Sequence, residues 1–271
     1  GIPTLYYILD INHRLIPFKF LQRFGKMVES RNIRHAQFVL AINHGLRDYT
    51  IAMGADPART RVLTAGIDPD RFDLTLDGKD IRKKYGIGAD DLVLFFVGWI
   101  HHFNGLKEVA LELAKSQNPD VKMLIVGDGE GYAELARIRE SRHLKDTLIL
   151  TGRRPYDEVP SFLAAADICL LPARPDEPIM QSIVPIKMYD YMGMGKPIIA
   201  TRLPGIMKEF GEDSGIVYID RPEEAVAKAL ELSRNGSIRE LGTKSRRYIE
   251  KFNWDSITDE FEKILKEIVK E

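Results

Sequence analysis

Short apolar runs alternate with helical patterns along most of this chain. The runs have the length and composition of buried strands and cover residues 4–9, 38–42, 92–97, 122–126, 147–150, 168–171, 197–200 and 215–219. Helical patterns lie between them at 18–32, 106–115, 131–141, 159–165, 187–194 and 222–232, and residues 238–271 are helical with an interruption at 252–255. Strands that alternate with helices in this way predict a parallel, doubly wound α/β sheet.

The strands fall into two groups, which predict two domains. The last six form one Rossmann-like unit, and the first two belong to a different sheet. The join is expected between residues 60 and 80, where Gly66, Asp68 and Pro69 interrupt the periodicity. We divide the chain into the end of an N-terminal domain (1–65), the Rossmann-like domain (66–250) and a helix that crosses back (251–271). Because residue 1 enters directly into a strand, most of the first domain is expected upstream.

Composition narrows the function classes. The chain has 271 residues, of which 44% are hydrophobic, and a net charge of -1, which gives no reason to expect nucleic acid as a partner. The single Cys169 lies inside an apolar run, so we expect a buried thiol and no internal disulfide. No apolar run approaches the roughly 20 residues of a membrane span, and no signal peptide is visible. We therefore expect a cytoplasmic protein without a transmembrane segment.

Candidate binding residues lie in the loops that follow strands, because ligands of open α/β sheets bind at the strands' carboxyl ends. Gly98 and Gly105 bracket the first such loop, which opens a helix and lets the backbone approach a ligand closely. His101 and His102 could donate to a phosphate or a sugar hydroxyl, or be ordinary surface histidines. Gly127 begins a glycine cluster after the next strand, which we interpret as a tight turn near the ligand rather than a dinucleotide fingerprint.

Two further loops contribute candidates. Arg153 and Arg154 follow the strand at 147–150 and could bind phosphate or line a pocket for a base, although one of the pair could simply face solvent. The long, proline-rich loop 172–185 is of a length that usually carries function. Its last residues, Ser182, Ile183 and Val184, are expected to offer backbone N–H groups to a sugar or a phosphate.

The segment 185–197 is the most informative part of the sequence. It predicts a helix that carries Lys187 and Asp190 one turn apart and ends in glycines before a buried strand. A cation and a carboxylate on one face suit a nucleoside diphosphate, with the ammonium on the phosphates and the carboxylate on the ribose hydroxyls. The alternative is structural, with Asp190 paired to a nearby cation such as Lys187.

The order of these motifs resembles the retaining glycosyltransferases of family four, which have the GT-B fold. The resemblance spans nearly the whole chain and rests on the following segments as they stand here: 36–46 (AQFVLAINHGL), 62–68 (VLTAGID) with Phe72, 126–129 (VGDG), 151–152 (TG), 166–168 (ADI) with 171–172 (LP), 195–197 (GKP) and 252–254 (FNW). It implies a hexosyltransferase that moves a sugar from a nucleoside-diphosphate-sugar donor to a glycan, lipid or small-molecule acceptor, with retention. It also implies that residues 66–250 bind the donor, that the N-terminal domain binds the acceptor, and that no metal or other cofactor is needed.

Two departures from the family pattern affect the site. The family carries two glutamates eight positions apart, and this chain has Ser182 and Asp190 in those places. The family's phosphate-binding arginine and lysine would fall near Trp99 and Asn104, and both are absent. The positive charge would then come from Lys187, His101, His102 or Arg153. No catalytic residue can be assigned.

Other functions stay open at this point. The missing cations are compatible with a non-catalytic nucleotide-sugar-binding module or an inactive fragment, and a GT-B nucleotide-sugar epimerase is a further alternative. His13, just after the first strand, either faces the cleft between the domains or is an ordinary surface residue. Peripheral membrane contact through the N-terminal domain, most of which lies outside this sequence, is a possible partner interaction.

Overall fold

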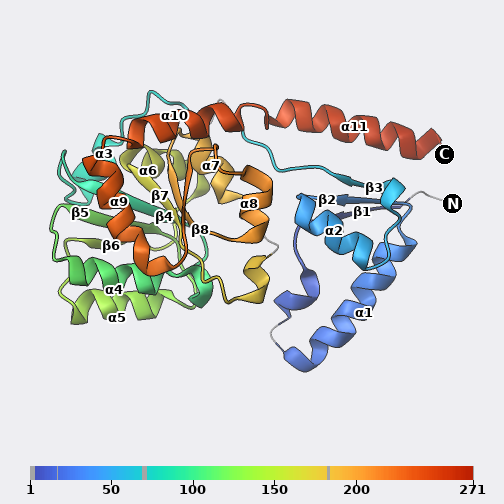
Figure 1. Cartoon of the computed structure of the whole chain (residues 1–271), viewed down its shortest axis with the longest axis horizontal. Coiled ribbons are helices and arrows are strands. Elements are labelled where there is room, and N and C mark those ends of the chain that lie inside the picture. The colour runs from blue at the N-terminus through green and yellow to red at the C-terminus, as the bar shows by residue number, and fades with distance from the viewer. Residues whose placement is uncertain (1–3, 17, 69–71, 182–183, 271) are drawn as a thin grey trace.

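The structure, a computed structural model, describes residues 4–16, 18–68, 72–181 and 184–270 (Figure 1). It contains two parallel β-sheets. The smaller has the order β1-β2-β3, with β1 at Leu5–Ile8, β2 at Phe38–Ala41 and β3 at Thr60–Val62. The larger has the order β6-β5-β4-β7-β8-β9, and its strands are β4 (Leu92–Val97), β5 (Val121–Val126), β6 (Leu148–Leu150), β7 (Ile168–Leu171), β8 (Ile198–Thr201) and β9 (Ile216–Ile219). The predicted α/β, Rossmann-like class is confirmed.

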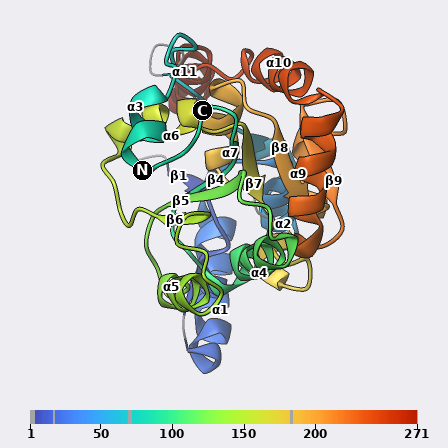
Figure 2. The same ribbon diagram turned by 90° about the vertical axis from the view of Figure 1, so that its left-hand side faces the viewer.

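Helices cover both faces of the larger sheet, as Figure 2 shows. The described helices are α1 (Lys19–His35), α2 (His44–Ala52), α3 (Lys79–Lys84), α4 (Leu106–Ser116), α5 (Tyr132–Ser141), α6 (Val159–Ala165), α7 (Lys187–Gly193), α8 (Pro204–Phe210), α9 (Ala225–Arg234), α10 (Ile238–Ile249) and α11 (Trp254–Lys270). Alternate strand residues enter two separate cores: Phe95 and Cys169 pack on one face of the sheet, and Phe96 and Leu170 on the other. The predicted buried Cys169 is confirmed, and burial raises the pKa of its thiol.

Four elements were missed by the apolar pattern: β3, α2, α3 and α8. Strand β3 is short, and two of its three residues are polar. Its Arg61 lies 5.3 Å from the Phe38 ring centroid and pairs with Glu267 at 2.7 Å. Helix α2 begins with a local signal instead, since the Asn43 side chain accepts a 2.8 Å hydrogen bond from the Leu46 N–H. Both features stabilise short elements without an apolar run.

Helix α11 lies against the three-stranded sheet, far along the chain from the strands it covers (Figure 1). Its Ile264 and Ile268 pack with Phe38, Leu40 and Leu63. The crossing is anchored at the connection that follows β3, where the Ile67 N–H donates to the Phe252 carbonyl at 2.8 Å. The chain therefore enters the larger domain and comes back from it at neighbouring points beside the smaller sheet. The domain limits given above stay a prediction. Among the described residues, no helix has the length and apolarity that a bilayer crossing requires.

The strand order fixes where a ligand would bind. The chain moves outward from β4 to β5 and β6, and then returns to place β7 on the other side of β4. Loops after β4 and β7 therefore leave in opposite directions, and the crevice between them is the usual binding position of such sheets. The loop after β4 contains Gly98, and the loop after β7 leads into α7.

Candidate active site at the carboxyl edge of the larger sheet

The floor of the site is made of backbone from three loops. Gly98 follows β4, Gly127 follows β5 and Gly152 lies two residues after β6. The Gly98 N–H donates to the Val126 carbonyl at 2.9 Å, and the Gly127 N–H donates to the Gly152 carbonyl at 3.0 Å. Gly127 has φ +147°, and a Cβ there would lie 1.9 Å from the Gly98 carbonyl oxygen. Glycine is thus required at Gly127 by the close approach of two loops.

Lys187, the first residue of α7, reaches over this floor. Its Nζ lies 3.9 Å from the Phe96 ring centroid, and a Cβ on Gly98 would meet it at 2.7 Å. Within the described residues, the ammonium has no carboxylate partner and therefore no ion pair with Asp190. Burial lowers its pKa to about 7. A half-buried cation without a counter-ion over a glycine backbone is suited to an anionic ligand.

Asp190 lies one turn further along α7 and is buried, with 9% of its surface exposed. The hydroxyl of Tyr156 donates to its carboxylate, at 3.2 Å from Oδ2 and 3.3 Å from Oδ1. Tyr156 belongs to the short 3₁₀ turn Tyr156–Glu158 and is half exposed. The sequence analysis missed this residue, although an exposed aromatic directly after Pro155 in a strand-end loop was a usable signal.

The two histidines of the loop after β4 already have carboxylate neighbours on the α5 side. His101 Nδ1 lies 2.7 Å from Glu130 Oε1, and the same carboxylate accepts from Trp99 Nε1 at 2.7 Å. His102 Nδ1 lies 3.7 Å from Glu134, which also pairs with Lys107. The expectation that His101 and His102 contact the ligand stays a prediction, and each already lies beside a carboxylate.

Asn104 stands near a position where the family resemblance implies a phosphate-binding cation. It is buried, and its Oδ1 accepts a 2.6 Å hydrogen bond from the His101 N–H, which closes the short turn His102–Asn104. An amide that caps a turn cannot also contact a phosphate as a cation. The amino group that lies over Gly98 is instead that of Lys187.

The structure gives few contacts for the remaining candidate residues. Arg153 is exposed and forms no hydrogen bond or ion pair with residues that the structure describes. Val184 is buried, while Ser182 and Ile183 lie outside the described residues. The loop 172–185 contacts the segment that follows β1, since Arg14 Nη1 donates a hydrogen bond to the Pro178 carbonyl at 3.0 Å. Among the described residues, no group of three or more His, Cys, Asp and Glu side chains could hold a metal ion.

Removing the Tyr156 hydroxyl tests whether it orients Asp190. Tyr156→Phe is expected to weaken nucleoside diphosphate binding by about 1 kcal/mol, because one hydrogen bond that fixes the carboxylate is lost. Tyr218→Phe is a matched control, since its hydroxyl donates to the Gly211 carbonyl at 2.7 Å, beyond this site. Calorimetric titration of both variants measures the difference. Equal affinities in the two variants would assign the Tyr156 contact to the fold alone.

Comparison with known proteins gives a consistent family. Residues 77–252 match the family described as "Glycosyl transferases group 1". The chain is 22% identical over 244 residues to N-acetyl-alpha-D-glucosaminyl L-malate synthase of Bacillus anthracis, covering 88% of this chain and 62% of that protein. It is 27% identical over 202 residues to the putative teichuronic acid biosynthesis glycosyltransferase TuaC of Bacillus subtilis, covering 74% of this chain and 47% of that protein. The chain therefore spans only about half to three fifths of the length of these relatives.

A solved structure shares the fold. The crystal structure of Anabaena Alr3699/HepE in complex with UDP has a TM-score of 0.82 and 19% sequence identity, and the match covers 98% of this chain and 72% of that one. The same protein was also solved with UDP-glucose. Both the smaller and the larger sheet lie within the matched region, so the likeness extends over the whole arrangement described above.

Proposed function

Since this chain belongs to the group 1 glycosyl transferases, we propose that it binds a nucleoside-diphosphate sugar and transfers the sugar to an acceptor. The observation that carries the proposal is the ammonium of Lys187, which has no counter-ion among the residues that the structure describes and lies over Gly98 where the loop after β4 leaves the sheet. A diphosphate supplies the missing negative charge. Asp190, one turn along α7, is then positioned for the ribose.

The same residues suit the chemistry of donor cleavage. When the bond between the sugar and the diphosphate breaks, negative charge develops on the leaving phosphate. A fixed cation stabilises that charge more than it stabilises the intact donor, and so lowers the barrier. Lys187 is that cation in this proposal, and the glycine backbone of Gly98 lets the phosphates approach it closely.

The finer assignments are proposals as well. A uridine nucleotide is the first donor to test, because the structurally similar HepE was solved with UDP and UDP-glucose. We propose a hexosyl donor, retention at the anomeric carbon, chemistry without a metal, and an acceptor bound from the side of the smaller sheet, with the enzyme acting in the cytoplasm. The Arg14–Pro178 hydrogen bond supports the acceptor position, because it brings the turn Asn12–Leu15, which follows β1, to the loop that precedes α7.

Calorimetric titration with UDP, GDP and ADP tests the proposal. We expect one of the three to bind at least tenfold more tightly than its own monophosphate, because the second phosphate adds a charge-assisted contact to Lys187. The corresponding glucose conjugate should compete for the same site. A folded protein that binds none of the three contradicts the proposal, whereas binding without release of the nucleoside diphosphate from the sugar would identify a non-catalytic binding module.

A further inference from the structure

Trp99 is exposed and yet held in a fixed position at the carboxyl edge of the larger sheet. It directly follows Gly98, over which the Lys187 amino group lies, and 58% of its surface is exposed. Its Nε1 donates a 2.7 Å hydrogen bond to Glu130 Oε2 in the loop after β5. Because this bond holds the indole in place, the ring offers a ligand a large apolar face at little entropic cost.

Polar groups flank the ring. Glu130 also lies beside His101, whose Nδ1 is 2.7 Å from Oε1, and both side chains are partly exposed. The Phe103 ring stacks on His101 with 4.6 Å between centroids and helps to hold this cluster together. A pyranose ring has an apolar face of C–H bonds and a rim of hydroxyls. A fixed indole with an exposed carboxylate at its edge matches both parts of such a ring.

Trp99 and Asp190 lie towards opposite faces of the larger sheet. Helix α7, which carries Asp190, packs in the core of one face, whereas helix α5, which begins two residues after Glu130, packs in the core of the other. Lys187 reaches from the start of α7 to the Phe96 ring, which belongs to the second core. A donor with its ribose at Asp190 and its diphosphate at Lys187 therefore extends its sugar towards Trp99.

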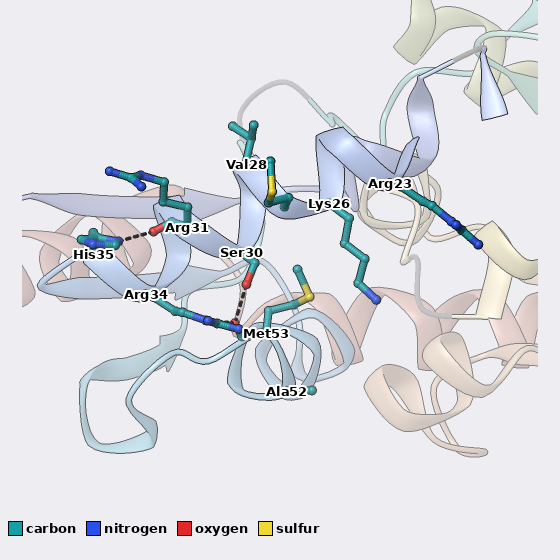
Figure 3. A pocket seen from close by; sticks show the side chains of 10 residues that line it. Arg23, Lys26, Val28, Ser30, Arg31, Arg34, His35, Ala52 and Met53 are labelled. Atoms are coloured by element: carbon teal, nitrogen blue, oxygen red, sulfur yellow. Dashed lines mark hydrogen bonds between the residues drawn. The ribbon is translucent and has the colours of Figure 1, made fainter. Parts of the chain in front are cut away.

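The hollow between α1 and the end of α2 does not compete for this ligand (Figure 3). It has a volume of about 750 Å³, and Arg23, Lys26 and Met27 lie in its wall. None of the described residues that line it is a tryptophan, a tyrosine, a phenylalanine or a carboxylate. It therefore has neither the aromatic face nor the anionic acceptor that Trp99 and Glu130 provide.

We propose that Trp99 recognises the transferred sugar by stacking on the apolar face of a neutral pyranose ring, while Glu130 accepts hydrogen bonds from its hydroxyls. This inference rests on the proposed donor site and adds to it the class of sugar. A sugar acid is disfavoured, because its carboxylate would lie beside that of Glu130. The family resemblance implies an arginine near position 99, so tryptophan there exchanges a contact to phosphate for a contact to sugar.

Calorimetric titration of the full chain with UDP and UDP-glucose tests this assignment, or with the GDP or ADP pair if that is the nucleotide bound. Trp99→Ala should lower the affinity for the glucose conjugate about tenfold and leave the affinity for the free diphosphate unchanged, which also reports an intact fold. Trp99→Phe keeps a ring that can stack and should restore most of the loss. The wild type should bind UDP-glucuronic acid more weakly than UDP-glucose, and Glu130→Gln should narrow that difference.

Fluorescence reports the contact independently of affinity. Trp99 and Trp254 are the two tryptophans of the chain, so Trp254→Phe leaves Trp99 as the single indole. UDP-glucose should change the emission of Trp99, and UDP should change it much less. The inference alone is overturned if the wild type binds UDP but Trp99→Ala loses affinity for both ligands equally or for neither, or if the emission does not respond to the conjugate. A wild type that binds no nucleoside diphosphate contradicts the proposed function itself, and this inference with it.

Discussion

Replacing Lys187 with alanine is expected to weaken nucleoside diphosphate binding by about 1.5–3 kcal/mol, the scale of a charge-assisted hydrogen bond in a sheltered site. The fold should survive, because the ammonium lies over the Phe96 ring and Gly98 and forms no ion pair with the residues that the structure describes. The free protein should even gain stability near and below neutral pH, since a cation without a counter-ion is removed. Arg153→Ala is the comparison variant, because Arg153 follows β6 at the same edge and, within the described part of the chain, also forms no ion pair.

The pH dependence of binding identifies the same group. The pKa of Lys187 is lowered to about 7 in the free protein, so the ammonium is present below that pH and is lost above it. Affinity for the diphosphate should therefore fall by up to tenfold per pH unit above about 7, until the pKa of the bound state is reached. Lys187→Ala lacks this decline, and the difference between the two proteins removes the titration of the ligand's own phosphate.

Stability should follow the opposite course with pH. Because the folded-state pKa lies below the usual 10.5, the unfolded chain binds more protons between about 7 and 10.5. The free energy of unfolding should therefore rise with pH across that window in the wild type, and this contribution should be absent from Lys187→Ala.

Unchanged diphosphate affinity in Lys187→Ala, together with a large loss of affinity in Arg153→Ala, would move the phosphate site to the loop after β6.

The sequence predicted the larger sheet well because its strands are buried on both faces. Phe95 and Phe96 enter different cores, so the whole strand is apolar and stands out from its surroundings. Strand β3 does not stand out, since Arg61 covers Phe38 with its side chain and pairs with a residue more than 200 positions away. A polar strand that is stabilised by such a distant helix leaves no periodic signal of its own.

Within the candidate site, local spacing was informative and long-range pairing was not. Lys187 and Asp190 could be placed together because a helix brings positions three apart to one side. Tyr156 and Glu130 could not, because their partners lie in distant elements and no pattern in the sequence links them. The sequence also could not distinguish a free cation from a paired one, which is the property that separates Lys187 from His101 in the structure.

Replacing Asp190 with asparagine should weaken a nucleoside diphosphate by about 1–3 kcal/mol, because both ribose hydroxyls would then share one accepting oxygen. The Tyr156 hydroxyl can still donate to the asparagine carbonyl, so the contact between α7 and the loop after β6 is kept. Asp190→Glu adds one methylene but retains the carboxylate, and it should largely preserve binding. The two variants thus separate charge and accepting capacity from size.

A comparison of ribose with 2′-deoxyribose ligands makes the assignment specific. The wild type should prefer the ribose form of the diphosphate, because its carboxylate accepts hydrogen bonds from both ribose hydroxyls. Asp190→Asn should lose much of that preference, because its single accepting oxygen gains less from the 2′-hydroxyl. The structural alternative assigns Asp190 to its hydrogen bond with Tyr156. Under that alternative, Asp190→Asn keeps the hydrogen bond, leaves ligand affinity nearly unchanged, and both proteins discriminate equally between the two sugars. Isothermal titration with each ligand, alongside chemical denaturation of each variant, distinguishes the two roles, and equal discrimination would remove Asp190 from the ribose site.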